Sequence, residues 1–199
     1  MKKLYYFLFA LLATATLTAQ TPATHEVAVL AEDEISGQCG ENLYWHYADG
    51  TLTITGSGEM FNYTTSITGV APWNKFRNTI TQVVMPKGLT TIGSYAFDNC
   101  KALSTLTVPD SVTMIGNYAF RNCSTAYAII LGERLTNINN YAFYGCRKLT
   151  NIFIKAQTQP VLGGSSCFSN VPTSATIYVP CGQANAYQKR TILEQICYP

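Results

Sequence analysis

Histidine is scarce in this chain, and its scarcity argues against catalysis. The 199 residues include two histidines, His25 and His46. His46 lies in an expected strand, and a Cys-His hydrolase would need it beside a thiol such as Cys39, with a third group to orient the imidazole. Paired Cys or His residues at metal-binding spacing are lacking as well. We therefore expect that the protein is not an enzyme, and that it uses no cofactor and no metal.

Long apolar runs are lacking beyond the N-terminus. Met1-Lys2-Lys3 precedes an apolar run over residues 4–13 that is too short to span a bilayer, and small residues follow it. This pattern predicts a signal peptide at residues 1–19, cleaved after Ala15 or Ala19, and then a leader or linker at residues 20–36. We expect an exported protein, secreted, at the cell surface or in the periplasm, with no membrane span.

Charged residues are few, at 12% of the chain, and they are unevenly distributed. Residues 20–60 hold seven acidic and no basic side chains, whereas residues 61–199 hold eleven basic and four acidic ones, a balance of +7. Such asymmetry can favour anionic partners, but it is more often the solvated charge of two modules. No nucleic-acid partner is expected.

Internal repetition is what the chain has in abundance. Ile92-Gly-Ser-Tyr-Ala-Phe97-Asp-Asn-Cys100 returns one 23-residue period later, ending in Cys123, and again after a second such period, ending in Cys146. A fixed period of this length predicts a solenoid, in which each unit buries its apolar face against its neighbours. We expect core positions at Phe97, Phe120 and Phe143.

Seven cysteines in an exported chain would normally suggest disulfides. Cys100, Cys123 and Cys146 share one repeat position, where side chains of stacked coils point in parallel and are poorly placed for bridging. These three are expected to be buried thiols. For Cys39, Cys167, Cys181 and Cys197 the pairing stays open, and a Cys167–Cys181 bridge is one alternative.

The segments that flank the repeats predict caps. Two alternating segments joined by Asp49-Gly50 predict a β-hairpin within residues 37–68, which would form the N-terminal cap. Residues 69–199 would form the solenoid, beginning with a degenerate coil in which Trp73-Asn74 replaces Ala-Phe. Gly182 to Ile196 has helical character and would close the C-terminal end as a short helix.

The pattern Ile-Gly-x-Tyr-Ala-Phe-x-x-Cys-x-x-Leu-x-x-Leu-x-Val-Pro resembles the BspA-type leucine-rich repeats of exported bacterial surface proteins. The flanking segments resemble that family too, at Ser36–Trp45, Leu52–Met60, Ala71-Pro-Trp73 and Ile177–Pro180. The resemblance covers roughly residues 36–199. It implies a leucine-rich-repeat solenoid with a parallel strand face and, for some members, adhesion to host or bacterial surfaces. It implies no particular ligand.

Strand alternation indicates which side chains face solvent. If Leu106 and Val108 point inward, with their counterparts in later repeats, the residues between them point outward. We call this the outward row, and its members are Val84, Thr107, Ile130, Phe153 and Tyr178. Contiguous exposed apolar surface marks contact sites, although β-branched and aromatic residues also simply favour strands.

A ladder of tyrosines is the secondary candidate, because ring faces and hydroxyls can contact protein or sugar. Its members are Tyr95, Tyr118 and Tyr141. The alternative is that these rings only cover the core.

Together these observations predict a non-enzymatic recognition or adhesion module for protein or glycan on host or neighbouring cell surfaces. A structural subunit of a larger cell-envelope assembly is the alternative. The outward row would then be a protein–protein interface, which could also form a homodimer.

Overall fold

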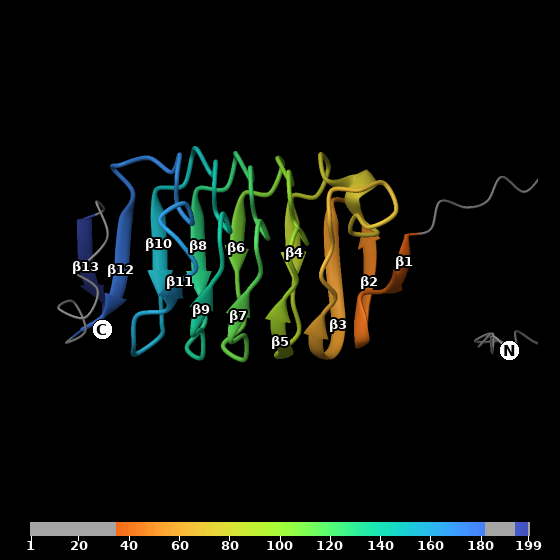
Figure 1. Ribbon diagram of the computed structural model, residues 1–199, viewed down its shortest axis with the longest axis horizontal. Helices are drawn as coiled ribbons and strands as arrows, with labels where there is room; N and C mark the ends of the chain where they lie inside the picture. The colour runs from red at the N-terminus through yellow and green to blue at the C-terminus, as the bar shows by residue number, and fades with distance from the viewer. Residues whose placement is uncertain (1–34, 182–193, 199) are drawn as a thin grey trace, which may run out of the picture. The chain divides into compact units, whose positions relative to one another are not determined.

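The computed structural model describes residues 35–181 and 194–198, the latter as backbone (Figure 1). They belong to one compact unit, Asp33–Pro199. The predicted signal peptide and most of the predicted linker lie outside the described residues. Among the described residues, none forms a helix long and apolar enough to cross a membrane.

Two sheets make up the described part of the chain. The first sheet has the strand order β1-β2-β3-β5-β7-β9-β11, with β4 also paired to β3. Its strands are β1 (Ser36–Gln38), β2 (Gly40–Ala48), β3 (Thr51–Met60), β4 (Gln82–Val84), β5 (Gly88–Ile92), β7 (Met114–Ile115), β9 (Asn137–Ile138) and β11 (Val161–Leu162).

The second sheet has the order β13-β12-β10-β8-β6, and its neighbouring strands are parallel. Its strands are β6 (Thr105–Thr107), β8 (Ala128–Leu131), β10 (Asn151–Ile154), β12 (Thr176–Pro180) and β13 (Glu194–Tyr198). A short 3-10 helix, η1 (Asn74–Phe76), precedes β4.

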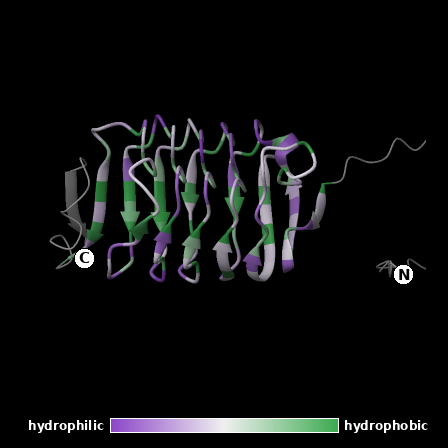
Figure 2. Ribbon diagram, in the orientation of Figure 1, coloured by the Kyte–Doolittle hydropathy of each residue, from purple (hydrophilic) through white to green (hydrophobic). Residues whose placement is uncertain are grey.

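Each 23-residue repeat contributes one strand to each sheet, and the register is constant. In the second sheet Leu106 pairs with Ile129, and Ile129 pairs with Ile152. In the first sheet Ile92 pairs with Ile115, and Ile115 pairs with Ile138. Figure 2 shows hydrophobic residues along the strands and hydrophilic residues in many of the turns. The predicted leucine-rich-repeat solenoid with parallel strands is therefore present.

Stacked rings run through the core between the two sheets. Phe97, Phe120 and Phe143 are at most 1% exposed, and successive ring centroids lie 5.1 and 5.5 Å apart. Trp73 extends the stack at one end, at 5.7 Å from Phe97, and Phe168 extends it at the other, at 5.2 Å from Phe143. The predicted core positions are confirmed, and the stack continues through both atypical end units.

Strand β3 of the antiparallel hairpin with β2 pairs with two further strands of the first sheet. The residues at the start of β3, Thr51 to Thr53, pair with β4, and Ser57 to Glu59 near its end pair with β5. Between these two ladders Gly56 has φ +96°, a value that residues with a side chain rarely adopt. A Cβ at Gly56 would also lie 2.0 Å from the Asn42 carbonyl oxygen. The hairpin occupies the predicted place, and its role as a cap stays a prediction.

The C-terminal segment differs from the expected helix. Glu194–Tyr198 is the strand β13, in parallel register with β12. The helix predicted from periodicity extends to Ile196, so that end of the prediction is wrong, because these residues extend an existing parallel ladder. Residues 182–193, where the rest of the predicted helix falls, lie outside the described residues.

Candidate functional site

Four of the five members of the outward row are in register across the second sheet, and the fifth, Val84, lies in β4 of the first sheet. Thr107 pairs with Ile130, Ile130 with Phe153, and Phe153 with Tyr178. The residues that flank the row in each strand are buried, such as Ile152 at 0% and Ile154 at 5% exposed in β10. Alternation along the strands therefore turns the row away from the core, as the sequence predicts.

Exposure along the outward row is graded. Val84 is 42% exposed and Thr107 is exposed, whereas Ile130, Phe153 and Tyr178 are half-buried. The Phe153 and Tyr178 rings stack with centroids 4.4 Å apart and planes 12° from parallel. The Tyr178 hydroxyl donates a hydrogen bond to Asn151 Oδ1 at 3.3 Å. These contacts hold the aromatic end of the row in one orientation, which lowers the entropy lost on binding.

The hairpin adds two residues to this face that the sequence reasoning missed. Val84 pairs with Thr53 of β3, and Thr53 pairs with the exposed His46 of β2. The alternation of residues 51–55 indicates that Thr53 faces outward, but nothing in the sequence indicates that β3 pairs in parallel with β4. The outward row thus continues onto the N-terminal hairpin as a more polar extension.

The tyrosine ladder lies in the turns that lead from the first sheet to the second. Tyr95 and Tyr118 stack at 4.7 Å, and Tyr118 and Tyr141 at 4.9 Å, with all three rings half-buried. Their φ values of 56°, 58° and 58° are left-handed, which is uncommon for a large side chain. Hydrogen bonds between coils fix this geometry, for example from the Tyr95 N–H to the Asn117 carbonyl at 2.9 Å.

An ion pair between Arg121 and Asp98 lies beside the tyrosine ladder. Arg121 Nε and Nη2 donate to Asp98 Oδ1 and Oδ2, both at 2.7 Å. The guanidinium carbon lies 5.6 Å from the Tyr95 ring centroid and 5.1 Å from that of Tyr118. The hydrogen bond to Asp98 raises the pKa of Arg121, and loss of hydration is the main cause that raises the pKa of Tyr95.

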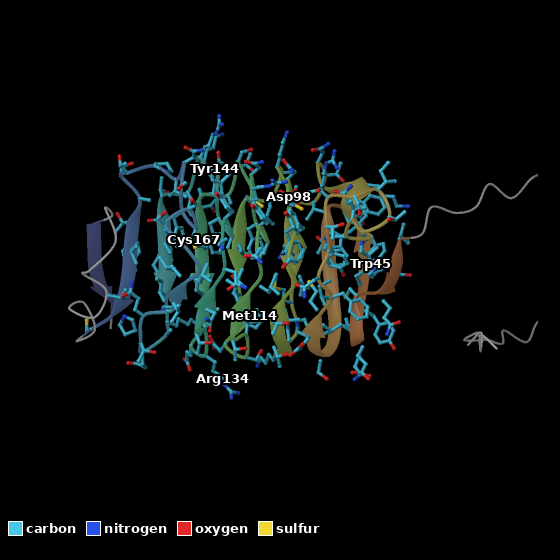
Figure 3. The ribbon with its side chains drawn as sticks, in the orientation of Figure 1. Trp45, Asp98, Met114, Arg134, Tyr144 and Cys167 are labelled. Atoms are coloured by element: carbon cyan, nitrogen blue, oxygen red, sulfur yellow. The ribbon has the colours of Figure 1, made fainter. Side chains whose placement is uncertain are left out.

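Sequence reasoning also missed this ion pair, although a signal was present. Asp98 and Arg121 occupy the same position of consecutive repeats, directly after the core phenylalanines. Equivalent positions of stacked coils lie side by side, so opposite charges there meet. Asp98 and Tyr144, which share this repeat position, lie near one edge of the solenoid, and Arg134 lies at the opposite edge (Figure 3).

The repeat cysteines are buried thiols, as predicted. Cys100, Cys123 and Cys146 are each 1% exposed and unbridged. Burial raises the pKa of Cys100 and Cys146 from 9.0 to about 12, and that of Cys123 well above 9.0. Cys123 Sγ lies 3.3 Å from the Phe97 carbonyl oxygen, to which it donates a hydrogen bond. These thiols pack as apolar groups.

Cys167 is a buried free thiol, so the alternative of a Cys167–Cys181 bridge is not realised. The Cys167 carbonyl accepts a hydrogen bond from the Phe143 N–H, as the Ala142 carbonyl does from the Phe120 N–H, so Cys167 takes the alanine position of the repeat. Phe168 follows at the phenylalanine position. Cys39 is also buried, and burial raises its pKa to about 12, which disfavours the thiolate that a nucleophile needs. In residues 35–181, no cluster of three His, Cys, Asp or Glu is placed to hold a metal ion.

These features define the class of the protein: a leucine-rich-repeat solenoid, a fold that is typically a non-enzymatic scaffold with an extended surface for protein interaction. The sequence matches the family described as BspA type Leucine rich repeat region (6 copies) over residues 72–190. The chain therefore belongs to the BspA-type leucine-rich-repeat family. No curated protein matches it.

Solved structures of similar proteins come from three bacteria. A leucine-rich repeat protein from Eubacterium ventriosum ATCC 27560 has a TM-score of 0.43 and 19% identity, with 72% of this chain and 55% of that chain covered. One from Bacteroides ovatus ATCC 8483 has a TM-score of 0.40 and 19% identity, with coverage of 80% and 40%. A leucine rich cell surface protein from Faecalibacterium prausnitzii A2-165 has a TM-score of 0.41 and 27% identity, with coverage of 81% and 48%. The chain spans about half the length of these proteins.

Proposed function

We propose that this chain is an exported, non-enzymatic recognition module that adheres to protein on a host or neighbouring cell surface, and that the outward row is its contact surface. The observation that carries the proposal is the in-register row of Thr107, Ile130, Phe153 and Tyr178 on the outer side of the second sheet, with the exposed Val84 of β4 as the remaining member of the outward row. Apolar side chains aligned across parallel strands form a continuous surface, and such surfaces serve as contact sites.

Protein is a better fit to this row than glycan. Its middle and C-terminal part is aliphatic and aromatic, with the stacked pair Phe153 and Tyr178. Tyrosine and phenylalanine are enriched at the desolvated centre of protein interfaces, with polar groups at the rim. The exposed Thr107 and the polar extension at Thr53 and His46 would supply such a rim.

A binding screen with point variants tests the proposal. The purified chain is immobilised and probed with extracellular-matrix proteins and a glycan array at low and physiological salt. We expect a salt-resistant protein ligand whose affinity falls about tenfold or more in Ile130→Ser and Phe153→Ser, because each removes apolar contact area from the interface centre. Ala128→Ser, two residues before Ile130 in β8, is the matched control and should bind normally.

Stability measurements separate a contact surface from a structural one. Because Ile130 and Phe153 are only half-buried, both variants should remain folded, with a small fall in melting temperature. A large loss of stability in both, or a ligand whose binding neither variant changes, would contradict the role of the outward row.

The same row would suit the second candidate function, a structural subunit of a cell-envelope assembly. The half-buried apolar side chains from β8, β10 and β12 would then meet another subunit or a second copy. Light scattering on the purified chain distinguishes the two, because a stable dimer that Phe153→Ser abolishes would favour assembly over adhesion.

A further inference from the structure

A cavity of about 340 Å³ lies beside the first turn of the tyrosine ladder. Loop residues 64–71 and the segment around η1 form one side of it, and the turn from Tyr95 to Lys101, with Arg121 from the next coil, forms the other. All of these residues are described, and the outward row contributes none of them. Its volume is that of a small-ligand site.

One wall of this cavity is aromatic. Tyr95 is the first ring of the ladder, with Tyr118 stacked against it at 4.7 Å. In the preceding unit Trp73 takes the phenylalanine position, so Ala71, two residues earlier, takes the tyrosine position; the stack stops there, and Tyr95 and Ala71 both line the cavity. A ring that ends a stack presents a flat apolar face, and the C–H groups of a sugar ring can pack on such a face.

The charge that lines the cavity is positive. Arg77, Lys101 and Arg121 contribute three cations, and Asp98 is the one acidic residue in the lining. Asp98 is already engaged by Arg121 through two hydrogen bonds of 2.7 Å. Arg77 contacts a neutral group, with Nη1 donating to Asn74 Oδ1 at 3.1 Å, and within the described residues neither Arg77 nor Lys101 forms an ion pair. Two positive charges are thus left for an anionic ligand.

The rest of the lining carries hydrogen-bonding groups suited to hydroxyls. Side-chain amides come from Asn74 and Asn78, and hydroxyls come from Thr64 and Thr65; the Asn99 amide also lines the cavity, but it is bonded to Asp98 and Asn122. Amides both donate and accept, as sugar hydroxyls do. A flat ring face, several amides and two uncompensated cations match one ligand chemistry, a saccharide that carries a carboxylate.

We propose that this cavity is a second binding site, which takes an acidic sugar unit of the uronic acid type. The sugar ring packs on Tyr95, its hydroxyls bond the asparagine amides, and its carboxylate is bound by Arg77 and Lys101. The site is independent of the outward row and would let one module contact an acidic glycan and a protein at the same time.

Calorimetric titration of the full chain with trigalacturonate tests this site, with maltotriose and inorganic phosphate as comparison ligands. We expect trigalacturonate to bind, maltotriose to bind at least about tenfold more weakly, and phosphate to bind more weakly still. Only the acidic sugar can both pack on the Tyr95 ring and pair its carboxylate with Arg77 and Lys101. Equal affinity for phosphate would show an anion site without sugar recognition, and would overturn the proposal. Equal affinity for maltotriose, or no binding of trigalacturonate, would do so too.

Variants locate the site and separate it from the proposed function. Arg77→Gln with Lys101→Gln should weaken trigalacturonate binding about tenfold or more, while the control pair Arg147→Gln with Lys148→Gln, also exposed and cationic, should leave it unchanged. Tyr95→Asn, which keeps a residue tolerant of positive φ but removes the ring, should weaken it as well. Phe153→Ser should have no effect. Loss of binding in the control pair or in Phe153→Ser would overturn the assignment to this cavity.

Discussion

Buried thiols show how a single residue type changes its behaviour inside a repeat. Cys100 and Cys146 sit at one position of the repeat, and each has lost almost all contact with water. The low polarity of that surrounding disfavours the thiolate, which is why their pKa values rise from 9.0 to about 12. At this scale the repeat cysteines act as small apolar residues and not as disulfide partners.

The raised pKa values predict that stability falls in alkali. Between about pH 9 and pH 12 the folded thiols keep protons that unfolded thiols have lost, so the folded state binds more protons. Their stabilising contribution is complete below pH 9 and disappears as the pH rises towards 12. Urea unfolding at pH 7.5 and at about pH 10.5 should therefore show a smaller alkaline loss in the Cys100→Ala, Cys146→Ala variant than in the parent.

Val112→Ala is the control for this comparison. Val112 is fully buried and does not titrate, so its truncation should lower the free energy of unfolding by a similar amount at both pH values. If the free energy of unfolding falls equally between the two pH values in the parent and in the double cysteine variant, other groups, such as the buried Tyr63, cause the fall.

Among the elements, β3 pairs with three other strands, β2, β4 and β5. It is antiparallel to β2 along most of its length, yet it also aligns β4 through its start and β5 through its end. Both partners belong to the first sheet, and the register of β3 against β5 shifts between Gly58 and Glu59, beside the positive φ values of Gly56 and Gly58, at +96° and +105°. The hairpin therefore sets the register for both parallel ladders.

Two glycine variants should separate backbone strain from steric conflict in β3. Gly58→Ala meets open space and should cost about 1 kcal/mol of unfolding free energy from its positive φ alone. Gly56→Ala adds a Cβ 2.0 Å from the Asn42 carbonyl, so it should cost clearly more, about 2 to 4 kcal/mol. Chemical unfolding of both variants checks the order, and equal losses would contradict a tight contact between β2 and β3 at Gly56.

For the molecule as a whole, each coil contacts mainly the coils before and after it. Backbone hydrogen bonds link successive turns in the same pattern, such as Phe97 N–H to the Ala119 carbonyl and Phe120 N–H to the Ala142 carbonyl, both at 2.8 Å. Stability of such a fold is close to a sum over repeats and their interfaces.

Deletion of one complete period should therefore be tolerated. Removing residues 116–138 takes out one full repeat and joins Ile115 to Asn139, which preserves the repeat phase. We expect a folded chain with cooperative unfolding at a lower temperature, as circular dichroism would measure. Removal of residues 116–126 is the control, because it shifts the phase and places polar residues at core positions. Unfolding of both deletions would contradict a fold built from interchangeable coils.

The sequence by itself determined the solenoid, its period and its core. Identical spacing of Phe97, Phe120 and Phe143 leaves only stacking of equivalent positions to bury them, and alternation in strands such as Asn151–Ile154 decides which side chains face outward. The hairpin at Asp49-Gly50 is local as well, because it has a recognisable turn signal.

Tertiary structure alone decided what depends on contacts between units. Pairing of β3 with both β4 and β5, the ion pair of Arg121 with Asp98 and the cavity beside Tyr95 each join segments that lie a full repeat or more apart in the sequence. The strand at Glu194–Tyr198 belongs here too, because a preformed parallel edge offers backbone hydrogen bonds that outweigh weak helical periodicity. The free energy of these contacts arises only when the coils are stacked, and for the ion pair alone the repeat places Asp98 and Arg121 at equivalent positions in the sequence.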